Sequence, residues 1–75
     1  MSTNQKAIEM FERNEYEKAM ELFHQAVNES RDVQSLNNLA WMYLYEEEDY
    51  AKSLELILEA VDMKPNHDFP YSVLR

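Results

Sequence analysis

The chain has 75 residues, of which 45% are hydrophobic and 29% are charged, and its net charge is −8. This length allows one small domain with a thin core, because short chains bury a smaller fraction of their surface than long ones. The composition is that of a folded protein rather than a disordered one. A strongly acidic surface repels phosphates, so we expect neither nucleic acid nor a membrane as a partner. The charge favours solubility first and, where a protein or peptide binds, a basic one.

Cysteine is absent, which excludes disulfides and thiolate metal sites and fits a reducing compartment. The first residues are polar and show no apolar segment typical of a secretory signal. The longest stretch without a charge, residues 33–45, is too short and too polar to span a bilayer. We therefore expect a cytoplasmic protein.

Glycine is also absent and only two prolines occur, which disfavours folds that depend on many tight turns. Abundant Glu, Leu, Ala and Met favour helices. The spacing of apolar residues predicts four helices, at roughly 3–13, 16–29, 33–46 and 49–63. The predicted fold class is all-α, with four antiparallel helices in two hairpins.

The first predicted helix has the weakest apolar stripe, formed by Ala7, Met10 and Phe11. Polar residues occupy its outer positions, as expected of a terminal helix whose outer side faces water. Asn14 is expected to end this helix, because asparagine tolerates the left-handed backbone conformation.

The other three helices have fuller stripes at helical spacing. In the second these are Tyr16, Ala19, Met20, Phe23, Ala26 and Val27; in the third Leu36, Leu39, Ala40, Tyr43 and Leu44; in the fourth Tyr50, Ser53, Leu54, Ile57, Ala60 and Val61. Ser30 or Asp32 is expected to cap the third helix, and Pro65 to end the fourth.

The last residues predict a short tail or a partial fifth helix, capped by Asp68 and starting near Pro70. Such a short helix is unstable alone. It therefore either frays or docks through its apolar residues on the fourth helix beside Leu58.

The chain contains an internal repeat. Residues 15–27 align without a gap on residues 49–61, a shift of 34, and the matched pairs are Tyr16 with Tyr50, Lys18 with Lys52, Leu22 with Leu56, Phe23 with Ile57, Ala26 with Ala60, and Val27 with Val61. The preceding segments align with a shift of 33, as in Ala7 and Ala40. The change of shift places a one-residue insertion in 46–48, where an exposed turn between helices would tolerate it.

This pattern resembles the tetratricopeptide repeat, a family of helical hairpins with a period of 34 residues. The resemblance rests on Glu15-Tyr16 and Asp49-Tyr50, on the spaced alanines, on Asn38-Leu39-Ala40 with Tyr43, and on Pro65. It implies an α-solenoid fragment in a single domain, with repeat one at about 1–33, repeat two at about 34–67 and a cap segment at about 68–75. Arg31 stands where the family prefers proline, so the turn there is expected to differ.

The resemblance also implies a function in protein binding, as a scaffold that holds a peptide or protein segment on the concave face lined by the first helix of each repeat. The residues at those positions are Gln34, Asn37, Asn38, Trp41 and Tyr45 in repeat two, and Asn4, Ile8 and Glu12 in repeat one. Asn38 and Trp41 lie off the core stripe, which independently suggests another role. The alternative is that Trp41 packs on a neighbour and the asparagines face water. A family subclass grips C-terminal carboxylates with a set of Lys, Asn and Arg residues. Asn38 stands at one of its positions, but the others hold Asn4, Ile8, Phe69 and Val73, so the cationic part is missing and we expect a different mode.

A second reading concerns the fourth helix, where Leu56 and Leu58 widen the apolar surface. Repeat units rarely bury their own faces alone. This surface predicts either a self-associating homodimer or a fragment of a longer array.

Chemistry is not predicted. The two histidines have no partners at metal-ligand spacing, and the acidic run 46–49 lacks the glycine and alternating ligands of a calcium loop. A glycine-flanked nucleophile motif is excluded by composition. We therefore expect no enzyme activity, no cofactor and no metal.

Overall fold

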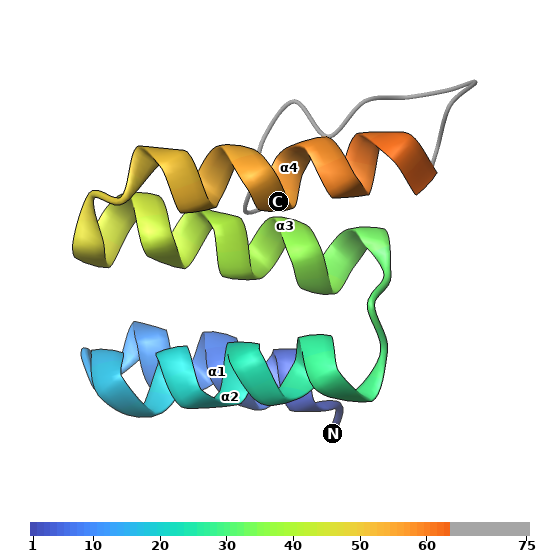
Figure 1. The fold of residues 1–75 in the computed structure, drawn as a ribbon. Helices are drawn as coiled ribbons and strands as arrows, with labels where there is room; N and C mark the ends of the chain where they lie inside the picture. The colour runs from blue at the N-terminus through green and yellow to red at the C-terminus, as the bar shows by residue number, and fades with distance from the viewer. Residues whose placement is uncertain (64–75) are drawn as a thin grey trace.

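The computed structural model describes residues 1–63, which form four α-helices: α1 (Thr3–Glu12), α2 (Tyr16–Glu29), α3 (Val33–Met42) and α4 (Tyr50–Met63). A π-helical turn, η1 (Tyr43–Glu47), continues α3 (Figure 1). No strand occurs in this part of the chain, so the all-α class is confirmed. The four predicted helix ranges agree with these bounds to within one residue once η1 is counted with α3. The predicted stop at Pro65 and the tail or fifth helix lie outside the described residues.

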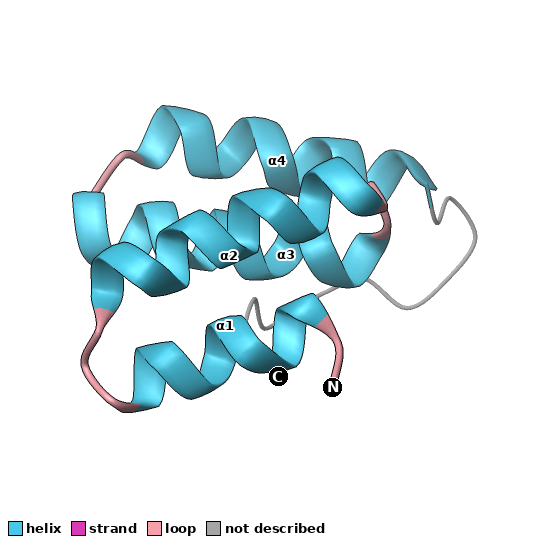
Figure 2. Ribbon diagram, turned by 90° about the horizontal axis from the view of Figure 1, so that it is seen from below, coloured by secondary structure: helices cyan, strands magenta, loops and turns pink. Residues whose placement is uncertain are grey.

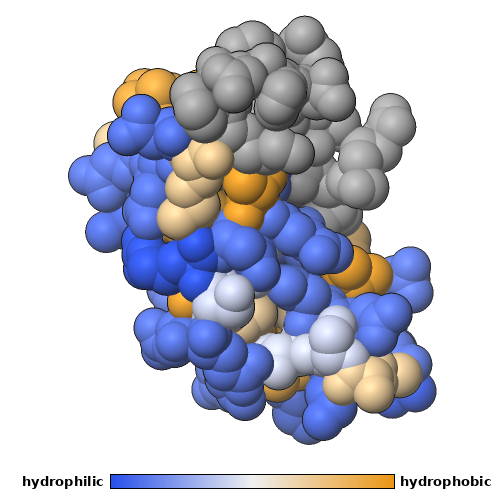
Figure 3. All heavy atoms as spheres, turned by 90° about the vertical axis from the view of Figure 1, so that its right-hand side faces the viewer, coloured by the Kyte–Doolittle hydropathy of each residue, from blue (hydrophilic) through white to orange (hydrophobic). Residues whose placement is uncertain are grey.

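Consecutive helices run antiparallel, and the closest packing pairs α1 with α2 and α3 with α4 (Figures 1 and 2). The two pairs are joined by packing of α2 against α3. Seen from the end where α2 passes into α3, the surface is mostly hydrophilic with small separate apolar patches (Figure 3). Among the described helices, none is both long enough and apolar enough to cross a bilayer.

The core consists of one large aromatic ring surrounded by leucines, one methionine and small residues. Phe23, Leu36 and Met42 are at most 1% exposed. Five alanines are at most 3% exposed: Ala7, Ala19, Ala26, Ala40 and Ala60. Alanine at a helix contact lets the backbones approach closely, since interaxial distance depends on the side chains between them. Most residues of the predicted stripes of α1, α2 and α3 therefore lie in or against the core, but Leu44 is 37% exposed. In the predicted stripe of α4, Tyr50 and Leu54 are 67% and 57% exposed, so these two residues do not face the core.

Local hydrogen bonds set the helix ends. Ser2 and Gln5 form a capping box at the start of α1. Asp32 caps α3 by accepting a hydrogen bond from the Ser35 backbone N–H at 2.8 Å, and the Ser30 hydroxyl donates to Asp32 at 3.0 Å. Of the two predicted caps, Asp32 is the one that holds the helix.

The connection between α2 and α3 is tied to α4 by an ion pair. The Arg31 guanidinium donates two hydrogen bonds to the Glu59 carboxylate, at 2.6 and 2.7 Å. A fork of this kind fixes geometry as well as charge. Arg31, which stands where tetratricopeptide repeats prefer proline, thus links the connection between α2 and α3 to Glu59 of α4.

Asp32→Ala is expected to lower the free energy of unfolding by about 1 kcal/mol at neutral pH, because an N-cap is lost. The hydrogen bond from the Ser35 backbone lowers the pKa of Asp32. A lowered folded-state pKa means that the stabilisation is present above the unfolded-state pKa of about 3.9 and disappears as the pH falls through the folded-state value. Urea unfolding followed by Trp41 fluorescence at several pH values measures the difference.

The matched control is Asp32→Asn, which caps without a charge. We expect it to retain most of the stability and to lose the pH dependence of the difference. Equal stability of Asp32→Ala and the parent protein at pH 7 would contradict the capping role.

Candidate functional site

The π-helical turn η1 accounts for the extra residue of the second repeat. The backbone N–H of Glu48 donates to the Tyr43 carbonyl, five residues back, and the N–H of Asp49 donates to the same carbonyl at 3.0 Å. The insertion predicted in 46–48 is therefore absorbed by widening the last turn of the third helix. Such π-turns are frequent at functional sites.

Within residues 1–63, two residues adopt the left-handed conformation without being glycine. Asn14 has φ 65° directly after the cap of α1, as predicted for the residue that ends this helix, and Glu48 has φ 52° directly after η1. Glutamate has no side-chain advantage there, and an L-residue with a Cβ is strained in this region. The strained turn is thus adjacent to the widened helical turn.

Four aromatic rings meet beside η1, and we call them the aromatic cluster: Phe11, Tyr16, Trp41 and Tyr45. Trp41 and Tyr45 are four residues apart on one helical face and stack with centroids 4.7 Å apart and planes at 10°. The Phe11 ring meets Trp41 edge-on at 4.8 Å and Tyr45 at 5.2 Å. Edge-to-face and offset-stacked rings attract one another beyond the burial of their area. The cluster therefore joins α1, α2 and α3 at one end.

The aromatic cluster is not sealed from solvent. Tyr45 is 53% exposed, and the other three rings are half-buried. Large aromatic rings that are rigidly packed on one side and open on the other offer contact area at low entropic cost. The outer side of the cluster faces solvent.

A polar network continues from the aromatic cluster along α1 and α3. The Asn4 side-chain amide donates to the Ser35 hydroxyl at 2.9 Å, and the Asn38 amide donates to Asn4 Oδ1 at 3.3 Å. Asn37 is only 7% exposed, and its Oδ1 has no hydrogen-bond partner within residues 1–63. Buried acceptors are nearly always paired in folded proteins, so this oxygen stands out.

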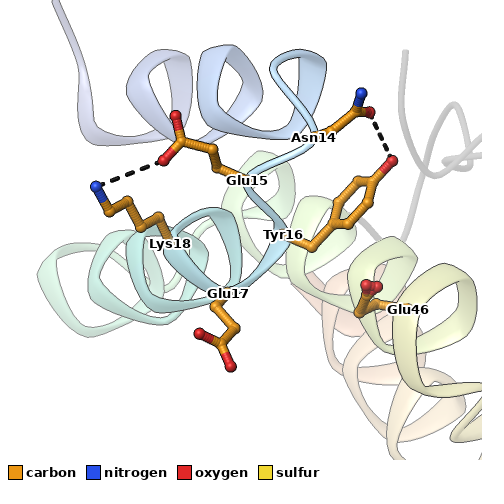
Figure 4. Close-up of a pocket in the computed structure, with 6 residues that line it drawn as sticks. All are labelled: Asn14, Glu15, Tyr16, Glu17, Lys18 and Glu46. Carbon is orange, nitrogen blue, oxygen red and sulfur yellow. Dashed lines mark hydrogen bonds and ion pairs between the residues drawn. The ribbon is translucent and has the colours of Figure 1, made fainter.

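The surroundings of the aromatic cluster are acidic. A pocket of about 380 Å³ is walled by Tyr16 and Met20, and four carboxylates complete its lining: Glu17, Glu21, Glu46 and Glu47. In the adjoining pocket, of about 460 Å³, Glu46 of η1 lies across from α2 (Figure 4). There the Tyr16 hydroxyl donates to Asn14 Oδ1 at 2.8 Å, and Lys18 pairs with Glu15 at 3.4 Å. Interaction with the Tyr45 hydroxyl, with smaller contributions from desolvation and the Glu46 charge, raises the pKa of Tyr16.

The structure sorts the predicted groove residues into three groups. Trp41 and Tyr45 are brought together, whereas Gln34 and Glu12 are exposed and their side chains form no hydrogen bond among the described residues. Ile8 is half-buried and packs against the core. The structure also agrees with the alternative prediction that Trp41 packs on a neighbour, because Trp41 contacts Phe11 and is half-buried.

Three predictions need correction. Asn37 and Asn38 were expected to face the groove, but they are 7% and 5% exposed, and Asn38 links α3 with α1 through Asn4. Leu56 was assigned to an open self-association face, but it is 8% exposed and belongs to the core. Leu58 is exposed as expected, at 59%, and its exposed neighbour on α4 is Leu54, at 57%.

Phe11 and Tyr16 were not predicted to belong to the site. Both were assigned to core stripes, and each has a ring that is only half-buried. The available signal was the arrangement of Trp41 and Tyr45 at i and i+4 beside an inserted residue, which indicates an aromatic face that needs partners.

Comparison of the chain with models of protein families, with curated proteins and with solved structures gave no match in any of the three. The resemblance to tetratricopeptide repeats therefore remains a prediction from the residues. The aromatic cluster, the polar network and the acidic surroundings carry the functional argument.

Glu48→Gly is expected to raise the free energy of unfolding by about 1 kcal/mol, because glycine adopts the left-handed conformation without a Cβ clash. Glu48→Val is expected to lower it by at least as much. Urea unfolding followed by Trp41 fluorescence gives both values.

Asn14→Gly is the comparison, and we expect a smaller effect because asparagine already tolerates this conformation. If glycine at position 48 destabilised the protein and valine left it unchanged, the strained geometry at the end of η1 would be wrong.

Proposed function

We propose that this protein is an interaction module that binds an extended segment of another protein along the outer side of α3. The observation that carries the proposal is the stacked Trp41–Tyr45 pair, packed on Phe11 from behind and open to solvent in front. Tryptophan and tyrosine are the residues that most often dominate binding energy at protein interfaces.

The binding track is a row along one side of α3 and η1, consisting of Gln34, Asn37, Trp41 and Tyr45. The last three follow at i, i+4 and i+8, which places them in a line on a helix. At about 1.5 Å per residue the row is about 16 Å long, enough for about five residues of extended chain. The length thus suits a short linear segment rather than a folded domain.

Asn37 belongs to this row, but it is only 7% exposed, and its Oδ1 is buried without a hydrogen-bond partner among residues 1–63. A bound segment would reach this oxygen only after neighbouring side chains moved. The accessible polar group of the track is therefore the exposed amide of Gln34, which can pair with a backbone N–H or C=O of a bound chain. The specificity then lies mainly in the residue placed on Trp41.

Charge points to a basic segment. Glu46 lies beside Tyr16 next to the aromatic cluster, and the pocket of Tyr16 and Met20 is lined by four carboxylates and no cation. A cationic side chain near aromatic rings gains both Coulomb and cation–π attraction. The track itself carries no cation, so it suits an internal segment better than a C-terminal carboxylate. The tetratricopeptide resemblance supports the same mode, and the proposal assigns no reaction to the protein.

Selection of binders from a library of random 12-residue peptides tests the proposal, followed by calorimetric titration of the selected sequences. We expect peptides with an aromatic or large apolar residue and one or more Lys or Arg. Trp41→Ala and Tyr45→Ala should each weaken binding at least tenfold, because hot-spot aromatic residues cost about 2 kcal/mol or more when truncated.

Met63→Ala is the control, since Met63 is a 44% exposed apolar residue at the end of α4, away from the track. It should bind like the parent protein, and helix content by circular dichroism should be equal in all variants. A selection that yields no peptide, or peptides that bind Trp41→Ala and Tyr45→Ala normally, would refute the proposed function.

A further inference from the structure

Helix α4 has two apolar faces, and only one of them is packed against other parts of residues 1–63. Ser53, Leu56 and Ala60 face the core and are at most 8% exposed. On the adjacent side Tyr50, Leu54 and Leu58 are 67%, 57% and 59% exposed. These three residues follow at i, i+4 and i+8 and therefore form one stripe, which we call the α4 stripe.

The internal repeat shows what such a stripe receives. With the shift of 34, the α4 stripe corresponds to Tyr16, Met20 and His24 of α2. Tyr16 and Met20 are half-buried where α2 packs on the third helix and its π-turn, and His24 is exposed at the edge of this contact. Tyr16 lies 6.1 Å from the Tyr45 ring, and His24 Nε2 lies 3.1 Å from the Tyr43 hydroxyl.

The substitutions between the two copies make the α4 stripe the more apolar of the two. His24 of α2 corresponds to Leu58, and Met20 corresponds to Leu54. A solvent-facing position of a small soluble helix normally carries polar residues. Replacement of a polar residue by leucine at an exposed position is the pattern of a contact surface.

The charges around the α4 stripe decide which kind of helix fits. Glu55 and Asp62 are exposed on the same helix, and the acidic residues 46–49 precede it. The protein as a whole has a net charge of −8, so a second copy would bring like charges together. A helix with basic flanks has the complementary charge.

We propose that the α4 stripe is the docking site for an amphipathic helix of another protein. This helix carries an apolar stripe like that of Leu36, Leu39 and Ala40 in α3, flanked by Lys or Arg. It binds α4 as α3 binds α2, on a surface separate from the Trp41–Tyr45 track. The inference does not depend on the peptide-binding function, and both surfaces can be occupied together.

The chain supplies its own probe, since residues 32–45 already pack on the equivalent stripe of α2. Two fluorescently labelled peptides of this sequence are compared, one with two lysines added at each end and one with two glutamates. We expect the lysine-flanked peptide to bind the full chain at least tenfold more tightly at low salt. The difference should shrink near 1 M salt, where the Debye length is about 3 Å.

Leu58→Glu and Leu54→Glu are expected to weaken the lysine-flanked peptide at least tenfold. The matched control is Met63→Glu, which introduces the same charge at a 44% exposed apolar residue off the stripe. It should bind normally. Retained binding by Leu58→Glu would mean that the peptide replaces α3 within the protein, and would overturn the proposal.

Light scattering of the full chain without peptide resolves the other occupants. We expect a monomer across the concentration range. A dimer abolished by Leu58→Glu would assign the stripe to a second copy. A monomer that binds neither peptide, and that Leu58→Glu destabilises, would assign the stripe to residues 64–75. Either result would overturn this proposal, and neither would contradict the proposed binding of a segment to the Trp41–Tyr45 track.

Discussion

The packing of α2 against α3 is the contact on which the rest of the structure depends, because it joins the two hairpins through the core and brings α1 beside α3. Phe23 supplies the large side chain at 1% exposure, and Leu36 and Met42 are fully buried around it. At the remaining helix contacts, alanines that are 0–3% exposed allow the helix backbones to approach closely. A chain of this size has only one such core, so the position of every surface residue follows from this contact.

The contact also places α1 beside α3 and so creates the site. Asn4 and Phe11 of α1 reach Ser35 and Trp41 of α3, near the two ends of the same side of the molecule. The widened turn carries Tyr45, which stacks on Trp41 one turn earlier. The regular repeat builds the scaffold, and its one irregularity shapes the surface that differs from a plain repeat.

Much of the fold could be predicted from periodicity, because each helix carries a stripe at helical spacing and Asn14 and Asp32 mark ends by known mechanisms. The directions of the side chains in α3 could not be predicted in this way. This helix contacts α1, α2 and α4, so residues 35–40 are all buried, polar ones included. The prediction assumed that the helix buries only one face, so it placed Asn38 outside the core. For Leu56 the error was the opposite one: it was predicted to be exposed but is buried. Helix α4 has two apolar sides, and the sequence alone does not say which of them packs against α3.

The most direct test of the account is the set of NOEs between aromatic rings in solution, because no regular feature of a helix forces Phe11 to meet Trp41. The account predicts strong NOEs from the Phe11 ring to the indole of Trp41, whose centroids lie 4.8 Å apart, with Tyr45 protons shifted upfield by the stacked indole. Absence of these NOEs in a protein with native helix content would contradict the arrangement of α1 beside α3, and the proposed binding track with it.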